Sequence, residues 1–458
     1  MLIPRPISKL SLQYWILALL LVILFLTGGS SRADAQSLAI VHPLSVILCG
    51  GACISLRREH VTGRHWLLGW VCVIFALVLI QLIPLPAPFW QSLASRQDIV
   101  SVEKLTGNSE IARALTLAPT GGWHAVLSLF TPLALILWGA QLDRDDLFAL
   151  LPLIVILATS SGILGLLQTI SDPQGFLYLY RITNNGAAVG IFANRNHAAT
   201  LLACLFPILA VYASTARGNP QAVRIRQLIA VAIAIVLVPL ILVTGSRSGL
   251  VGAVIGLVAA VILYQGLRSV RRDKRNQIRI LPILAGFGLI SLGLLTHFLS
   301  RAEAIERLFS EPSSKAGRTD FWAVSVDLFW KHLPWGSGPG SFVEAYQVLA
   351  PAKFLNPYYV NHAHNDWVET AVAFGIPGII AMSGALVAFG IRSCGLWRRA
   401  NGSKRTVAFG RLASVIMVIL GVTSVFDYPL RTPVMMGLFA ICALWLIESG
   451  REGAASSK

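Results

Sequence analysis

This sequence has few charged residues. Asp, Glu, Lys and Arg make up only 13% of its 458 residues, whereas 55% are hydrophobic. Soluble domains carry about 25% charged residues, so an ordinary soluble domain is excluded. Several apolar runs reach 18 residues or more, which is long enough to cross a bilayer as a helix.

Cysteine is also scarce, and its positions exclude a second class of protein. All six cysteines lie in or at the ends of apolar runs: Cys49, Cys53, Cys72, Cys204, Cys394 and Cys442. None lies in a long polar segment, so we predict no disulfide framework.

The apolar runs predict an all-α fold, a polytopic integral membrane protein with about twelve transmembrane helices forming a single membrane domain over residues 1–458. The stretch TGGSSRADAQS after the first span resembles a cleavage region, so a secretory signal peptide is the alternative there. The predicted spans are 12–28, 38–56, 66–84, 121–140, 147–169, 197–215, 228–245, 249–266, 280–298, 368–390, 409–426 and 433–448.

The basic residues orient these spans. With the N-terminus inside, the inside segments hold 23 of the 37 basic residues and 7 of the 21 acidic ones, which is the whole net charge of +16. The outside segments hold 14 of each sign and are neutral. This asymmetry is the positive-inside bias of membrane proteins, and it predicts that both termini are cytoplasmic. The basic run 268–279 is therefore a topology signal, and no nucleic acid is expected as a partner.

Three longer segments lie outside: 85–120, 170–196 and 299–366. The last is the predicted large periplasmic loop. Within it, 318–331 has apolar residues at helical spacing, which predicts an amphipathic helix against the membrane or the bundle. Its apolar positions are Phe321, Trp322, Val324, Leu328 and Phe329.

Polar residues gather at four external span boundaries. Ionisable groups at membrane depth are costly, so such residues are candidates for a site. The motifs are FANRNHAAT with Arg195 and His197, VTGSRSGL with Arg247, GRTDFW with Arg318, and NHAHNDW with His362, His364 and Asn365.

Each motif also has a purely structural interpretation. An arginine at a helix end can reach the lipid headgroups, and GSRSG can be a turn capped by Ser246. Asn361 or Asn365 can cap the following helix beside Asp366. A histidine in a loop is often simply solvated. The recurrence of these groups on one side of the membrane favours a shared site.

The residue types indicate the chemistry of such a site. Arginine is a rigid donor of hydrogen bonds that fits phosphate oxygens, and histidine can act as a base near neutral pH. Together they suit transfer from a lipid diphosphate to an acceptor hydroxyl, with the arginines stabilising the leaving diphosphate. Such a donor is already activated, so no cofactor is expected.

A metal site is the alternative for the paired histidines. His362 and His364, with Asp366 two residues later, could bind a cation. A metal-dependent glycosyltransferase is expected to carry an external acidic pair such as DxD. The acidic stretch DRDD at 143–146 falls on the cytoplasmic side, so we expect no metal.

The motifs NHAHNDWVETAVAFGIPG, FANRNHAA, TGSRSG and GRTDFWAVSVDLFWKHLPWGSGPGSF resemble the O-antigen ligase and Wzy-type polymerase superfamily. The similar region covers about 180–390. The resemblance implies a multi-pass protein of the bacterial inner membrane with its active site facing the periplasm. It further implies a metal-independent, inverting glycosyltransferase acting on an undecaprenyl-diphosphate-linked glycan.

The resemblance also implies residue roles. Arg247 and Arg318 match the essential arginines of the family and His364 matches its catalytic histidine. Arg195, His197, His362 and Asn365 are the expected contacts to the diphosphate or the acceptor. The partners implied are the lipid-linked donor, membrane lipids, and a glycan or lipid A–core acceptor. The last external loop, with Asp427, Tyr428 and Arg431, receives no role.

Two questions stay open. Ligases of lipopolysaccharide biosynthesis and polymerases of O-antigen or exopolysaccharide share the donor and differ in the acceptor. The protein-glycosylating branch usually has a further C-terminal domain and is less expected here. The alternative class is a transporter or flippase of an anionic or lipid-linked substrate, although no predicted span has a charge at its centre, where alternating access needs a site.

Overall fold

The chain is all-α, with one short strand pair. A computed structural model describes residues 10–108, 110–216, 218–268, 313–351, 360–398 and 404–455. The strands β1 (Pro84–Leu85) and β2 (Arg113–Ala114) pair antiparallel. The long helices are α1 (Leu12–Thr27), α2 (Leu38–Ser55), α4 (His65–Leu82), α7 (Pro119–Ala140), α9 (Leu150–Ile170), α10 (Arg195–Ser214), α11 (Pro220–Thr244), α12 (Arg247–Arg268), α15 (Ser313–Lys331), α17 (Asp366–Arg398), α18 (Lys404–Thr423) and α19 (Pro433–Ala455). The shorter ones are α3 (Arg58–Val61), α5 (Ala87–Gln91), η2 (Ala94–Arg96), α6 (Gln97–Thr106), α8 (Arg144–Phe148), α16 (Phe342–Leu349) and η5 (Pro429–Arg431).

The predicted membrane spans coincide with helices wherever the structure describes them. In that part of the chain, ten helices are long and apolar enough to cross a bilayer, and α1 adds an apolar helix of 16 residues. The predicted span 280–298 lies outside the described residues. The fold class, a polytopic all-α membrane protein, is confirmed.

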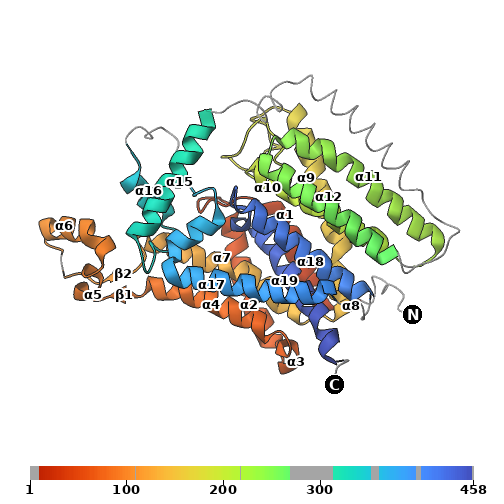
Figure 1. Cartoon of the computed structure of the whole chain (residues 1–458), viewed down its shortest axis with the longest axis horizontal. Coiled ribbons are helices and arrows are strands. Elements are labelled where there is room, and N and C mark those ends of the chain that lie inside the picture. The colour runs from red at the N-terminus through yellow and green to blue at the C-terminus, as the bar shows by residue number, and fades with distance from the viewer. Residues whose placement is uncertain are drawn as a thin grey trace.

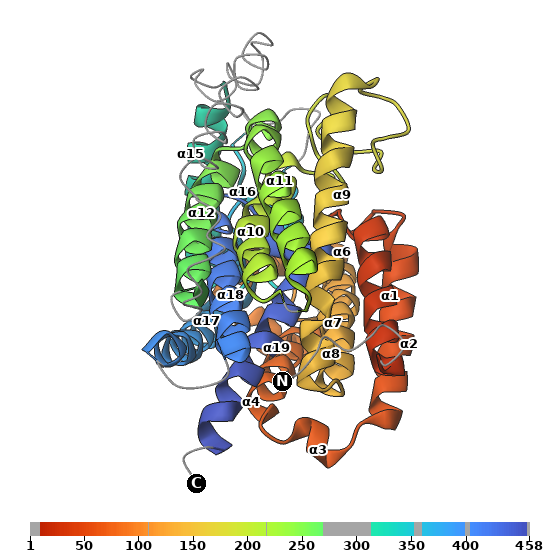
Figure 2. The ribbon, with the colours of Figure 1, turned by 90° about the vertical axis from the view of Figure 1, so that its right-hand side faces the viewer.

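Helices α10 and α19 form the centre of the bundle. In each of them 83% of the membrane-length window is buried, against 11% in α4. Helix α10 packs against α9, α11, α12 and α18, and Figures 1 and 2 show it enclosed by these neighbours. A helix buried on all sides can carry polar groups at its end into the interior, and α10 begins with the NRNH motif.

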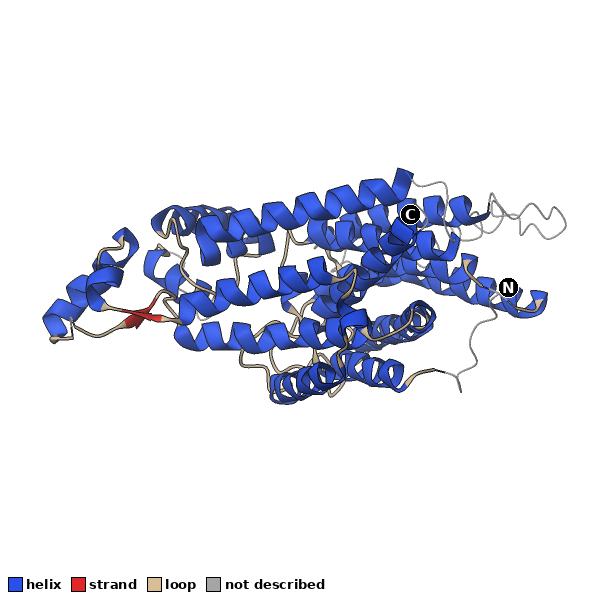
Figure 3. Ribbon diagram, turned by 90° about the horizontal axis from the view of Figure 1, so that it is seen from below, coloured by secondary structure: helices blue, strands red, loops and turns tan. Residues whose placement is uncertain are grey.

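Polar contacts define two ends of this bundle. At the terminal end, where α1 begins and α19 finishes, Arg64 contacts Glu448 and Arg405 contacts Asp145. The other end, here the lobe end, carries β1, β2, α5 and α6, which project beyond the bundle in Figures 1 and 3. The motifs FANRNHAAT, VTGSRSGL and NHAHNDW lie at helix termini on the lobe end, and GRTDFW lies within α15.

Helix α15 lies at the lobe end and packs on α16 and α17. Its side chains are described from Trp322 onwards. Val324 and Leu328 are buried, but Trp322, predicted on the same face, is 52% exposed and points outward with Trp330. Residues 322 and 324 are about 200° apart around a helix, which explains why they take opposite faces. Val324, Leu328 and Phe329 therefore pack inward, as expected of an amphipathic helix, while Trp322 takes the opposite side.

A break in α17 positions the segment that precedes it. Gly375 has φ +57° and ψ −140°, a conformation open to glycine, and a Cβ there would collide with the carbonyl oxygen of Pro334. The break lets the segment 334–338 pack alongside, where Ser337 N and Gly338 N donate to the carbonyl oxygens of Val372 and Ala373. The first turns of α17 are thereby fixed beside the lobe end.

Candidate active site

The NHAHNDW motif forms a tight turn directly before α17. The side-chain oxygen of Asn365 accepts hydrogen bonds from Trp367 N (3.0 Å) and Val368 N (3.1 Å), so Asn365 caps the helix. His364 has φ +51°, and it is the one non-glycine residue with positive φ among the described residues. This conformation is unfavourable for an L-residue, so the surrounding contacts must hold it.

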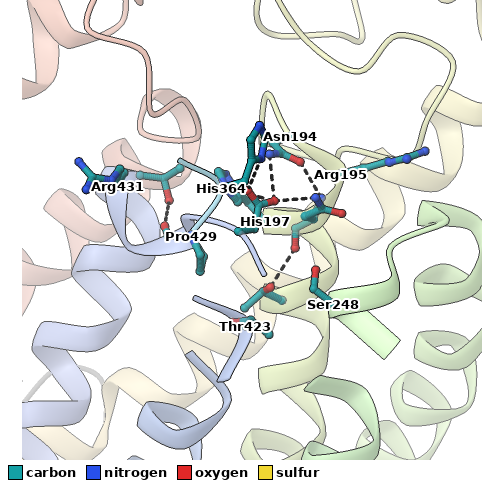
Figure 4. A network of polar contacts seen from close by, with 12 residues as sticks. Asn194, Arg195, His197, Ser248, His364, Thr423, Pro429 and Arg431 are labelled. Carbon is teal, nitrogen blue, oxygen red and sulfur yellow. Dashed lines mark hydrogen bonds and ion pairs between the residues drawn. The ribbon is translucent and has the colours of Figure 1, made fainter. Parts of the chain in front are cut away.

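The contact that holds His364 comes from a loop the sequence left without a role. Asp427 lies between α18 and α19 and is 1% exposed. Its Oδ1 is 3.4 Å from His364 Nδ1. Its Oδ2 accepts hydrogen bonds from Asn196 Nδ2 (2.6 Å) and Asn194 Nδ2 (3.2 Å). Figure 4 shows His364 and Asn194, which are far apart in the sequence, meeting in this network of polar contacts.

The Asp427 carboxyl is stabilised in its charged form. Burial raises its pKa, but hydrogen bonds from His364 and Asn196 and the charges of His364 and His197 outweigh burial and lower the pKa to about 2. The carboxylate therefore stays ionised at neutral pH.

Three histidines surround the ring of Tyr428. The distances from its centroid are 4.4 Å to His362, 5.1 Å to His364 and 5.1 Å to His197. Tyr428 is 5% exposed, and burial raises the pKa of its hydroxyl, so the hydroxyl stays neutral. Its apolar ring lies between the imidazoles and keeps them apart.

His362 belongs to a second charged cluster. Its Nδ1 lies 2.9 Å from Glu369 Oε1, and Arg431 bridges Glu369 (3.1 Å) and Asp366 (3.1 Å). Ser424 Oγ also donates to Asp366. Burial opposes the charge of Arg431, but the two carboxylates raise its pKa overall. This cluster fastens the His364 turn to α17 and to the α18–α19 loop.

The pairing pattern separates the two histidines that could have shared a metal ion. His362 points to Glu369 and His364 to Asp427, while Asp366 is engaged by Arg431 and Ser424. Among the described residues, no group of three His, Cys, Asp or Glu side chains is arranged to hold a metal ion.

Exposure singles out His364 among the three imidazoles. The side chain of His364 is 32% exposed, against 14% for His362 and 1% for His197. With Nδ1 directed to Asp427, Nε2 is on the far side of the ring. A His364 ring held in this way can present Nε2 to a substrate.

Arg247 lies at the start of α12. It is exposed between Ser246 and Ser248, which are buried, and Ser246 Oγ accepts a hydrogen bond from Gly249 N (3.0 Å), so Ser246 caps the helix. A Cβ at Gly249 would collide with Ala199, and one at Gly252 would lie 3.2 Å from Thr423. The start of α12 therefore packs against the first turns of α10 and the end of α18, the elements that flank Asp427.

The remaining predicted residues are placed differently. His197 is almost fully buried behind Asp427, against Tyr428 and Phe192, so the predicted direct contact with substrate does not fit its position. Arg195 is partly buried, and Figure 4 shows its side chain directed away from His364. Arg318 lies in α15, but its side chain is outside the described part.

Sequence reasoning missed the residues that organise the site: Asp427, Asn194, Asn196, Glu369 and Arg431. A usable signal existed for two of them. Asp427 and Arg431 are the charged residues of a short polar loop between two apolar spans, where a charge is costly without a purpose.

Comparison with known families agrees with the motifs. Residues 229–383 match the model of a family described as O-Antigen ligase. This range contains Arg247, Arg318 and the NHAHN turn, and stops before Asp427. No curated protein matches the chain. The resemblance predicted from the motifs is thus confirmed over this range, and residues 229–383 are an O-antigen ligase family domain.

Proposed function

We propose that this chain transfers a saccharide from undecaprenyl diphosphate to an acceptor hydroxyl at the periplasmic face of the bacterial inner membrane, during assembly of a cell-surface polysaccharide. The O-antigen ligase domain supports a membrane glycan ligase or polymerase. The observation that carries the proposal is the His364 ring, which is partly exposed and held by the buried carboxylate of Asp427.

In the proposed reaction His364 is the general base. Asp427 accepts a hydrogen bond from Nδ1–H of His364 and fixes the ring, so that Nε2 takes the proton of the acceptor hydroxyl. The acceptor oxygen then bonds to the anomeric carbon while the bond from that carbon to the diphosphate oxygen breaks. One displacement from the opposite face inverts the anomeric carbon, and lipid diphosphate leaves.

Arginine charge makes this departure possible. Arg247, exposed at the start of α12, would neutralise negative charge as it develops on the leaving diphosphate. Arg318, from the helix that packs on α17, would be the second such group. These cations supply the stabilisation that a metal provides in other glycosyltransferases, so the proposed reaction is metal-independent.

The test is turnover of lipid-linked saccharide extracted from the cells that make this chain, in proteoliposomes holding the purified protein. We expect H364A to lower the release of lipid diphosphate by about 10²–10⁴-fold. We expect R247A to lower it by about 10²–10³-fold. N219A, which removes a helix cap at the start of α11, is the matched control and should keep normal turnover.

Normal turnover by H364A would overturn the proposed mechanism. Addition of EDTA should leave turnover unchanged, and loss of turnover on chelation would overturn the metal-independent part alone. The length of the product distinguishes ligase from polymerase, because one transfer to lipid A–core adds the glycan once and polymerisation gives a ladder.

A further inference from the structure

The NRNH segment delivers three polar side chains to one oxygen of Asp427. Asn196 Nδ2 donates to Oδ2 at 2.6 Å and Asn194 Nδ2 donates at 3.2 Å. His197 Nε2 lies 3.9 Å from the same oxygen. These residues come from the start of α10, about 230 positions before Asp427 in the chain.

The segment is itself held firmly. The side-chain oxygen of Asn194 caps α10 by accepting from Asn196 N (2.9 Å), and Asn184 Oδ1 accepts from Arg195 N (3.0 Å). Ala193 N donates to the carbonyl oxygen of Gly29. The backbone of 193–196 and the side chain of Asn194 are therefore held by contacts that do not depend on Asp427.

A carboxylate is planar, so fixing one oxygen sets the direction of the other. With Oδ2 held by two amides, Oδ1 faces His364 Nδ1. We propose that Asn196, assisted by Asn194, is a positioning residue that keeps Asp427 ionised and oriented toward His364. This inference rests on the proposed function, in which His364 is the base.

An amide suits this role because it donates a hydrogen bond at every pH. The other groups that face Asp427 are His364 from the α17 turn, His197 from α10 and the neighbouring Tyr428. Beyond Tyr428 lie His362, Glu369 and Arg431. Of the hydrogen bonds to the Asp427 carboxylate, the one from Asn196 is the shortest, and the amide carries no charge that pH could change.

The first variant tests the missing donor. N196L keeps a side chain of similar size but cannot donate to Asp427. Loss of a hydrogen bond to a charged group predicts a fall of about tenfold in kcat. KM for the lipid-linked donor should stay unchanged, because Asn196 contacts Asp427 and not substrate in this arrangement.

The second variant makes the donor depend on pH. N196D would place a carboxyl group against Asp427, and two carboxyls this close share one proton. The protonated pair can still donate to Oδ2, whereas the doubly ionised pair repels. The ratio of N196D to wild-type kcat should rise at least about fivefold from pH 8.5 to pH 6. The ratio for N196L should stay flat.

Each kcat is divided by the amount of folded protein, which size-exclusion chromatography measures at each pH. A loss of stability is then not mistaken for a loss of positioning. N219L and N219D, made at the cap of α11 on the terminal side, are the matched controls and should give flat ratios near one. Wild-type kcat in N196L, or a flat ratio in N196D, would overturn the inference. If H364A turns over normally, the proposed function fails instead, whatever Asn196 does.

Discussion

Each end of the bundle buries a carboxylate, and the two carboxylates have different partners. At the terminal end, Glu448 is 4% exposed and lies between Arg64 (2.7 Å) and Arg451 (2.9 Å). At the lobe end, Asp427 is 1% exposed and contacts Asn194, Asn196 and His364. Both charges are satisfied, so burial and pairing alone do not tell the two regions apart.

The difference lies in what the partners can do. Arginine keeps its proton at any ordinary pH, so the Glu448 cluster can only fasten helices together. Imidazole exchanges a proton near neutral pH, so the Asp427 cluster can take part in a reaction. The chemistry of the partner, more than the depth of the charge, therefore distinguishes the proposed active site from the structural cluster.

The largest expected effect comes from D427N. The introduced amide would donate to His364 Nδ1, which forces the proton onto Nε2 and leaves His364 unable to accept one. We expect kcat to fall by about 10³-fold with KM for the donor little changed. Turnover of lipid-linked saccharide in proteoliposomes measures this. Normal turnover by D427N would mean that Asp427, like Glu448, has only a structural role.

E448Q should give the opposite pattern. It leaves the buried Arg64 without its charged partner, which costs about 3 kcal/mol of stability. Turnover per folded molecule should be unchanged, since Glu448 lies at the terminal end. Thermal unfolding in detergent, together with kcat, checks both parts. A fall in kcat without unfolding would break the comparison, because it would give the terminal end a part in the reaction.

E369Q should fall between these two. Glu369 accepts from His362, Ala363 N and Arg431, and so fastens the turn that carries His364. A neutral amide weakens this anchor without touching the His364–Asp427 contact, so we expect kcat to fall about tenfold. R431K, which keeps the positive charge but loses the two-nitrogen bridge between Glu369 and Asp366, should cause a similar or smaller fall. An E369Q loss as large as that of D427N would mean that both carboxylates act directly.

The sequence was a good guide to elements with strong local signals. Hydropathy and charge bias located the helices because the bilayer demands long apolar runs, and the NHAHNDW turn was identified because polar residues are rare at such boundaries. Asn365 was correctly expected to cap α17. These predictions need only residues that are neighbours in the chain.

The organisation of the site could not be predicted in the same way. Asp427 meets His364 across 63 positions and Asn196 across 231, and no local pattern encodes which loop ends meet. His197 was expected beside substrate, yet it lies two residues after Arg195, about 200° around the helix, and is turned into the interior. For the same reason Trp322 and Val324 take opposite sides of α15, so Trp322 faces outward while Val324, Leu328 and Phe329 pack inward.

The smallest expected effect comes from the ion pair between Asp145 and Arg405. Like Glu448, Asp145 pairs with an arginine, but it is more exposed to water. Asp145 contacts Arg405 at 2.7 Å at the terminal end, and the two side chains are 33% and 24% exposed. Water already solvates such a pair, so D145N should cost less than about 1 kcal/mol and leave kcat unchanged. Thermal unfolding at low and high salt measures it, and the small difference should shrink with salt. A cost equal to that of E448Q would show that pairing with arginine, and not burial, sets the stability of the terminal end.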